Sequence, residues 1–174
     1  FQINRRVDTG DILVQKKFPI YKDDNMLTLG TRLCNSGAEI MIDAIGKIEE
    51  GSIEILKQTQ ESVSFAPKIT KKMRCINWNW SAIKIHNWVR GLSPYPSMYT
   101  FLNGKIIKVF KTFIEKSSIH KPGEIIKINH DSILIGTDNN LLGLLEIQSE
   151  GKKKLFIKEY LKGSPIDKKW IFGK

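Results

Sequence analysis

Five β-prone runs separated by turn-forming residues occupy residues 98–148, and this pattern constrains the fold more than any other feature of the chain. The runs are MYTFL, KIIKVFKTF, EIIKI, SILIGT and LLGLLEIQ. The separating residues are Asn103-Gly104, Pro122-Gly123, Asn129–Asp131 and Asp138–Asn140. Short strands that recur every ten residues or so, about five in all, are typical of an OB-like antiparallel β-barrel. We therefore predict such a barrel, with flanking helices, over residues 76–174.

The flanking helices are predicted near residues 81–92 and 155–161. The second should pack on the barrel through Phe156, Tyr160 and Leu161, because these residues recur at helical spacing. Residues 56–75 contain Pro67, have no sustained period and become basic at their end, which indicates a linker.

Residues 1–55 have a different organisation. Two short β-prone runs, residues 1–4 and 11–20, flank the loop RRVDTG, and a helix is predicted from about Leu29 to Ile48 with Thr28 as its cap. Two strands followed by a helix are typical of an α/β domain. The chain opens on Phe and on FQIN, which resembles the middle of a strand, so we expect an upstream portion.

The net charge of +10 is unevenly distributed along the chain. Residues 1–55 hold 7 of the 28 Lys and Arg and 9 of the 18 Asp and Glu, which gives −2; residues 56–174 hold the other 21 and 9, which gives +12. A basic segment joined to a nearly neutral one favours a polyanionic partner, with nucleic acid as the first candidate. A general bias toward Lys, Ile and Asn is the alternative explanation, but residues 1–55 share that bias and stay slightly acidic.

Several classes of protein are disfavoured by the sequence. Cys34 and Cys75 are isolated, which predicts two free thiols and neither a disulfide framework nor a zinc site. No run of about 18 apolar residues indicates a membrane span, and we expect a cytoplasmic protein with no metal and no membrane partner.

The segment RVDTGDIL, residues 6–13, is the sharpest local signal for chemistry. It places the carboxylate of Asp8 on a tight glycine-containing loop, where functional residues are often found. By itself, an Asp in such a loop more often forms an Asx-type turn that caps its own backbone.

Four blocks of the chain together resemble the methionyl-tRNA formyltransferase family. The first is DTGDIL followed by Phe-Pro-Ile, an Asp-Asp pair and Gly-Ala-Glu; the others are FAPKITKK (residues 65–72), INWNWSAIKIHNWVRGLSPYPSMYT (76–100) and LLEIQSEGKKK (144–154). They occur in the order of the family. Departures are Arg6-Val7 for the usual Gly-Leu, Asn77 for Asp and Ser97 for Gly.

This resemblance implies an activity and a set of site residues. Residues 1–55 would be the end of a Rossmann-like formyltransferase domain, in which Asp8 is catalytic and Val7, Asp8, Thr9 and Gly10 line the folate cleft. The reaction would move a formyl group from 10-formyltetrahydrofolate to the α-amino group of initiator methionyl-tRNA. The catalytic Asn and His of the family would lie upstream, so we expect this chain alone to be inactive, and a monomer.

For the second domain the resemblance implies binding of the tRNA acceptor stem through a basic channel. The predicted contact residues, chosen from motif positions and from charge, are Lys68, Lys71, Lys72, Arg74, Arg90, Lys152 and Lys153. Lys105, Lys108 and Lys111 are weak candidates, because residues three apart on a regular strand alternate faces.

Two alternative functions stay open from the sequence. A formyltransferase for a UDP-linked amino sugar would share the loop aspartate, but would not need a second domain with a net charge of +12. A stand-alone tRNA-binding or RNA-binding module from a truncated enzyme would need only that second domain.

Overall fold

The computed structural model describes residues 1–59, 63–118 and 120–174, and the chain divides into two compact units. The first consists of residues 1–24 and 28–68, and the second of residues 25–27 and 69–174. Residues 60–62 of the predicted linker lie outside the described residues. The predicted domain limits of 1–55, 56–75 and 76–174 stay predictions.

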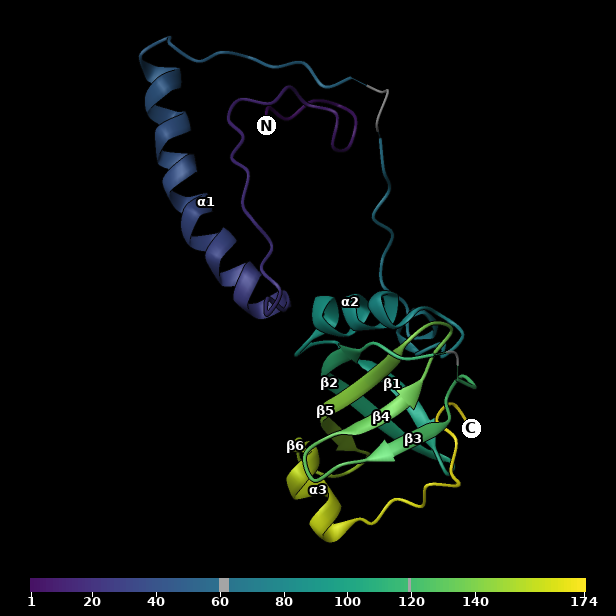
Figure 1. Ribbon diagram of the computed structural model, residues 1–174. Coiled ribbons are helices and arrows are strands. Elements are labelled where there is room, and N and C mark those ends of the chain that lie inside the picture. Colours follow the sequence, from purple (N-terminus) through teal and green to yellow (C-terminus); the bar gives the residue numbers. More distant parts are fainter. Residues whose placement is uncertain (60–62, 119) are drawn as a thin grey trace. The chain divides into compact units, whose positions relative to one another are not determined.

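The first unit is built around the long helix α1, Met26–Glu49, which confirms the predicted helix (Figure 1). Thr28 is not its cap: the helix begins two residues earlier, and the Thr28 hydroxyl donates a hydrogen bond to Asp24 Oδ1 at 3.1 Å. The two strands predicted in residues 1–4 and 11–20 are not formed. The described residues of this unit contain one isolated bridge, Ile12 to Leu56, because an extended segment forms a strand only where a partner strand continues the ladder.

Asp24 fixes the start of α1. Its carboxylate receives two hydrogen bonds from the Arg32 guanidinium, at 2.7 and 3.0 Å, and one from the Tyr21 backbone N–H at 2.7 Å. The Arg32 guanidinium also lies over the Tyr21 ring, 4.5 Å from its centroid. These contacts tie the segment before the helix to the second turn of the helix.

The Asp24 contacts predict an acid-sensitive helix start. The hydrogen bonds from Arg32 lower the pKa of Asp24 to about 2. Because the pKa is depressed in the folded state, the stabilisation is present above the unfolded-state pKa of about 4 and is lost as the pH falls through about 2. We expect the α1 signal in circular dichroism to fall between these values in the wild type. Asp24→Asn should start lower at neutral pH and lack that step; identical acid profiles would contradict the assignment.

The described residues of the second unit form six antiparallel strands and two α-helices. The strands are β1 (Met98–Leu102), β2 (Lys105–Glu115), β3 (Ile125–Ile128), β4 (Ile133–Gly136), β5 (Leu141–Ser149) and β6 (Leu155–Phe156). The first five confirm the five predicted runs. They lie in the order β1-β2-β5-β4-β3, and β6 pairs with β5. Their inward side chains form the core, which includes Met98, Val109, Leu144 and Ile147.

The predicted barrel is not closed by strand pairing. β1 and β3 are the two ends of the strand order and do not pair with each other. Residues near the carboxy-terminus bridge them instead: Phe172 N–H donates to Gly123 O and Gly173 N–H to Phe101 O, both at 2.8 Å. The Phe172 side chain is buried, and its ring lies 5.6 Å from that of Trp78. The sheet is therefore open, with residues 171–173 spanning the gap.

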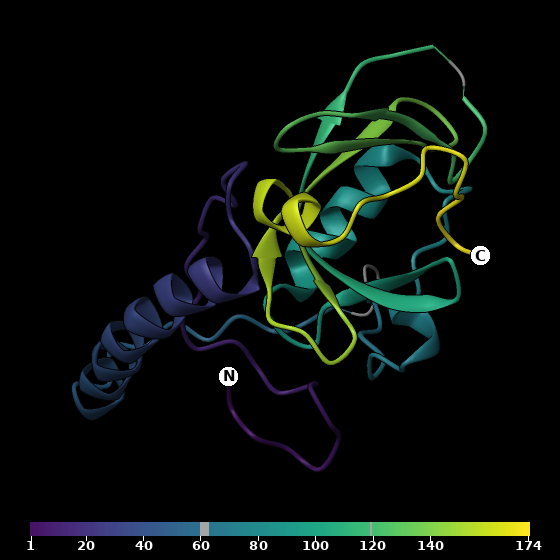
Figure 2. The same ribbon diagram turned by 90° about the horizontal axis from the view of Figure 1, so that it is seen from below.

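Helices α2 (Ala82–Leu92) and α3 (Ile157–Gly163) lie at opposite ends of the sheet (Figure 1; Figure 2). Both confirm predicted helices. The Ser81 hydroxyl caps α2 by accepting a hydrogen bond from Lys84 N–H. Tyr160 and Leu161 pack against the core as predicted, but Phe156 does not, because it precedes α3 and is 56% exposed.

Candidate functional site

The loop of residues 4–10 in the first unit is organised by Asn4. Its amide oxygen accepts hydrogen bonds from Arg6 N–H and from the Thr9 hydroxyl, both at 2.9 Å, and its amide nitrogen donates to Thr9 O at 3.1 Å. The bond to the backbone two residues on is the Asx-type turn considered for Asp8. Asn4 makes that turn, which leaves the carboxylate of Asp8 available.

Asp8 is exposed at the tip of this loop and has a φ of 55°, in the left-handed region that Asp tolerates better than most residues. Within the described part of the chain its carboxylate takes part in no ion pair or hydrogen bond. Gln58 donates from its side-chain amide to the carbonyl oxygens of Asp8 and Gly10. Gly10 is buried, and a side chain there would overlap the Gln2 carbonyl oxygen. The loop is thus held from both sides with Asp8 facing solvent.

A hollow of about 350 Å³ adjoins this loop. Its lining residues are Phe1, Asp8, Ile12, Val14, Gln15 and Gln58. Of the four predicted folate-binding residues, Asp8 lines the hollow, whereas Val7, Thr9 and Gly10 do not. Gln58 was missed by sequence reasoning, because it is 50 residues away along the chain and carries no local motif.

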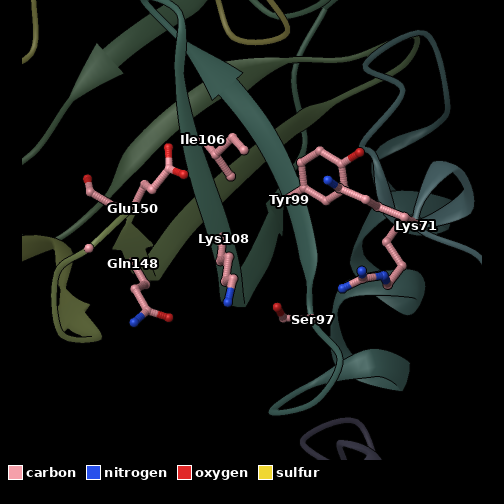
Figure 3. Close-up of a pocket in the computed structure, with 10 residues that line it drawn as sticks. Lys71, Ser97, Tyr99, Ile106, Lys108, Gln148 and Glu150 are labelled. Carbon is pink, nitrogen blue, oxygen red and sulfur yellow. The ribbon is translucent and has the colours of Figure 1, made fainter.

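A second pocket, of about 290 Å³, lies in the second unit (Figure 3). Its walls come from β1, β2, β5, the turn after β5, and the short helix η1 (Lys72–Arg74) with the residue before it. The lining residues are Lys71, Arg74, Ser97, Tyr99, Ile106, Lys108, Gln148, Ser149, Glu150 and Gly151. Tyr99, Lys108 and Gln148 are register neighbours on β1, β2 and β5, so they form one row across the outer face of the sheet.

Three cations face this pocket. Lys71 and Lys108 are exposed and, among the described residues, form no ion pair. Arg74 is held by a hydrogen bond from Nη1 to Pro96 O at 2.9 Å, which uses part of its guanidinium and no carboxylate. Because none of the three cations is in an ion pair with the described residues, each can interact with an anionic ligand.

The other residues predicted to bind tRNA are not among the lining residues of the pocket. Lys68 and Lys72 are exposed on either side of Lys71, and Arg90 on α2 donates from Nε to Asn87 Oδ1 at 2.9 Å. Lys152 and Lys153 follow Gly151 in the exposed turn after β5. None of these assignments is tested by the geometry, and they stay predictions.

The spacing argument was made against Lys105, Lys108 and Lys111 sharing one face, and it fails for the pair Lys108 and Lys111. A bulge interrupts the β2–β5 register between Val109 and Thr112. Val109 and Thr112 both point inward and are buried, so the residue before each points outward. Lys108 and Lys111 therefore share the outer face of the sheet, a result that regular alternation could not predict.

Ser97, which departs from the Gly of the family pattern, adopts a φ of 64°. Glycine populates that region without steric cost, which accounts for the family preference. The Ser97 hydroxyl donates to Pro96 O at 2.6 Å, and its N–H donates to Leu92 O at 2.9 Å. Both bonds hold the turn that leads into β1, where Ser97 lines the pocket.

Two titratable side chains of the second unit, His86 and Tyr99, have shifted pKa values and contact neighbouring side chains. His86 Nδ1 lies 2.8 Å from Thr112 Oγ1, and burial lowers the pKa of His86. Burial raises the pKa of Tyr99, with a further contribution from the Cys75 thiol.

Over residues 1–59, 63–118 and 120–174 no group of three or more His, Cys, Asp or Glu could hold a metal ion. None of the described helices is long and apolar enough to cross a membrane.

The family whose sequence pattern matches this chain is described as the formyl transferase C-terminal domain, over residues 68–165. The chain belongs to this family. The match covers the pocket in the second unit, with Lys71, Arg74 and the strands that line it.

Curated relatives extend the similarity over nearly the whole chain. A methionyl-tRNA formyltransferase of Caldanaerobacter subterraneus is 39% identical over 165 residues, which is 94% of this chain and 53% of the relative. One of Thermodesulfovibrio yellowstonii is 41% identical over 165 residues, or 95% of this chain and 53% of the relative. The chain is the carboxy-terminal part in this comparison and spans about half the length of these relatives.

Solved structures share the fold. HypX of Aquifex aeolicus in complex with tetrahydrofolic acid matches with a TM-score of 0.66 at 18% identity, over 94% of this chain and 29% of that one. WlaRD, a sugar 3N-formyl transferase solved with dTDP and 5-N-formyl-THF, matches with a TM-score of 0.64 at 24% identity, over 87% of this chain and 53% of that one. At these identities the likeness shows the fold and does not separate tRNA from sugar substrates.

Proposed function

We propose that this chain serves as the carboxy-terminal part of an enzyme that formylates methionyl initiator tRNA in the cytoplasm. The observation that carries the proposal is the pocket with Lys71, Arg74 and Lys108, which lies in a segment of net charge +12. The curated relatives named methionyl-tRNA formyltransferase support it. A nucleotide sugar carries few phosphates and would not need so large an excess of positive charge.

The tRNA phosphates would bind to the outer face of the sheet in the second unit. This open sheet would serve as the RNA-binding surface in place of an OB-like barrel, since residues 171–173 join the two ends of the strand order. Phosphate contacts from Lys and Arg fix position and affinity without reading sequence. Recognition of the initiator would then depend on further contacts.

The first unit would contribute Asp8 to the chemistry. The α-amine of the methionyl group attacks the formyl carbon of 10-formyltetrahydrofolate, the bond from that carbon to N10 breaks, the amine loses a proton and N10 gains one. The exposed carboxylate of Asp8 would orient an imidazole from the rest of the enzyme and relay the amine proton. Support for a folate donor comes from the structural relatives HypX and WlaRD, which were solved with tetrahydrofolic acid and with 5-N-formyl-THF.

The proposal is tested by the salt dependence of tRNA binding. Each phosphate contact releases counterions, so the logarithm of affinity falls with the logarithm of salt concentration. We expect the variant with Ala at Lys68, Lys71 and Lys72 and Gln at Arg74 to bind more weakly, with the slope reduced by about two to four, at roughly 0.7 to 0.9 per contact.

A charge-matched control uses four exposed lysines that do not line the pocket: Lys127, Lys158, Lys168 and Lys169. Replacing these by Ala should change the slope much less. Equal slopes in the two variants, with unchanged thermal unfolding, would show that the linker cations are solvated and that the proposed channel is misplaced.

A further inference from the structure

The two opposite sides of the pocket in the second unit carry different chemical groups (Figure 3). Lys71 lies beside Tyr99 on one side, Gln148 and Glu150 lie on the opposite side, and Lys108 lies between them. Tyr99 and Gln148 are separated by one strand, β2, so the two sides are two strand spacings, or about 10 Å, apart.

The side opposite Lys71 offers hydrogen-bond acceptors. Gln148 donates from Nε2 to Lys152 O at 2.6 Å, which holds the side chain in place, and its amide oxygen can accept a hydrogen bond from a ligand. The carboxylate of Glu150 forms no ion pair or hydrogen bond with the described residues. Glu150 N–H donates to Ile106 O at 3.2 Å, which fixes the residue at the edge of the pocket.

A carboxylate in a phosphate-binding pocket weakens binding unless the ligand brings it a donor. A ribose-phosphate unit has both features: its phosphate oxygens accept from Lys71, Arg74 and Lys108, and its 2′-hydroxyl can donate. A deoxyribose unit would leave Glu150 desolvated and repelled by the phosphate. Tyr99 is the aromatic residue in the lining, and its ring makes a T-shaped contact with the Phe101 ring, with 5.8 Å between the ring centroids. The sugar-phosphate backbone therefore fits this pocket better than a stacked base.

We propose that this pocket holds one ribose-phosphate unit of the RNA partner, with Glu150 accepting a hydrogen bond from its 2′-hydroxyl. The inference rests on the proposed function, because it assumes an RNA partner. It adds that Glu150 distinguishes RNA from DNA, whereas Lys71, Arg74 and Lys108 hold phosphate in either.

The experiment compares two minihelices with the acceptor-stem sequence of the initiator tRNA, one of RNA and one carrying 2′-fluoro groups. A 2′-fluoro group keeps the helical shape of RNA but cannot donate a hydrogen bond. Wild-type protein should prefer the hydroxyl form by about tenfold or more, as expected for a hydrogen bond to a charged group. Glu150→Ala should abolish most of that preference.

Two variants serve as matched controls. Glu115→Ala removes an exposed carboxylate that does not line the pocket and should keep the preference. Lys108→Gln should weaken both minihelices equally, as expected for a phosphate contact. Thermal unfolding checks that each variant folds.

The outcomes separate this inference from the proposed function. If all forms bind with strong salt dependence but Glu150→Ala keeps the full preference, the inference is overturned and the tRNA proposal stands. The same holds if Glu150→Ala and Glu115→Ala raise the affinity for both minihelices by the same factor. Glu150 would then act only by general repulsion of the phosphates. Failure of the wild type to bind either minihelix overturns both proposals.

Discussion

Replacing Asp8 by Asn should lower the rate of formyl transfer by about 10²- to 10⁴-fold, the usual contribution of a positioned acid-base group. Asn keeps the size and the left-handed backbone conformation that Asp8 adopts at φ 55°, and removes the negative charge. The effect should therefore come from lost chemistry and not from a rearranged loop, whose contacts run through Asn4 and Gln58.

The assay requires an amino-terminal half as well, because this chain matches only the carboxy-terminal half of its curated relatives. We suggest fusing the amino-terminal half of the Caldanaerobacter relative to this chain and measuring single-turnover formylation of methionyl-tRNA. Affinity for tRNA should stay unchanged, because Asp8 is an acid and is not among the cations proposed to contact phosphate. Asp23→Asn, another exposed acid in the same unit, is the matched control. A near-normal rate with Asn at position 8 would rule out the catalytic role.

The same fusion separates the alternatives left open by the sequence. Formylation of methionyl-tRNA by the fusion would exclude a module that only binds RNA. Transfer to an amino-sugar nucleotide, without transfer to tRNA, would favour the sugar formyltransferase that the fold alone permits.

Phe172→Ala should destabilise the second unit by about 3 to 5 kcal/mol, the range for removing a buried aromatic side chain. Phe172 is 2% exposed, packs on Trp78 and belongs to the segment that bridges β1 and β3. Its loss opens a cavity between β1 and β3, the two ends of the strand order, which do not pair with each other.

Phe156→Ala provides the comparison for Phe172, because it removes the same side chain from a position that is 56% exposed. We expect that variant to change stability by about 0.5 kcal/mol or less. Urea unfolding followed by tryptophan fluorescence measures both variants. Equal losses would show that residues 171–173 do not hold the sheet.

The sequence alone determined the local elements of the second unit. β-prone runs separated by turn residues placed β1 to β5, and the helix predicted near residues 81–92 corresponds to α2. These patterns are encoded by neighbours along the chain, so no tertiary information was needed. The family resemblance likewise depended on motifs that are contiguous in sequence.

Tertiary structure decided what depends on distant pairing. The strands predicted in residues 1–20 did not form, because extended segments need partner strands that periodicity cannot supply. The gap between β1 and β3 is bridged by residues 171–173, which no local signal could reveal. The bulge that brings Lys108 and Lys111 to one face, and the row that joins Tyr99 to Gln148, arise from strand register. Register is fixed by packing across the sheet, and so the pocket became visible only in the folded unit.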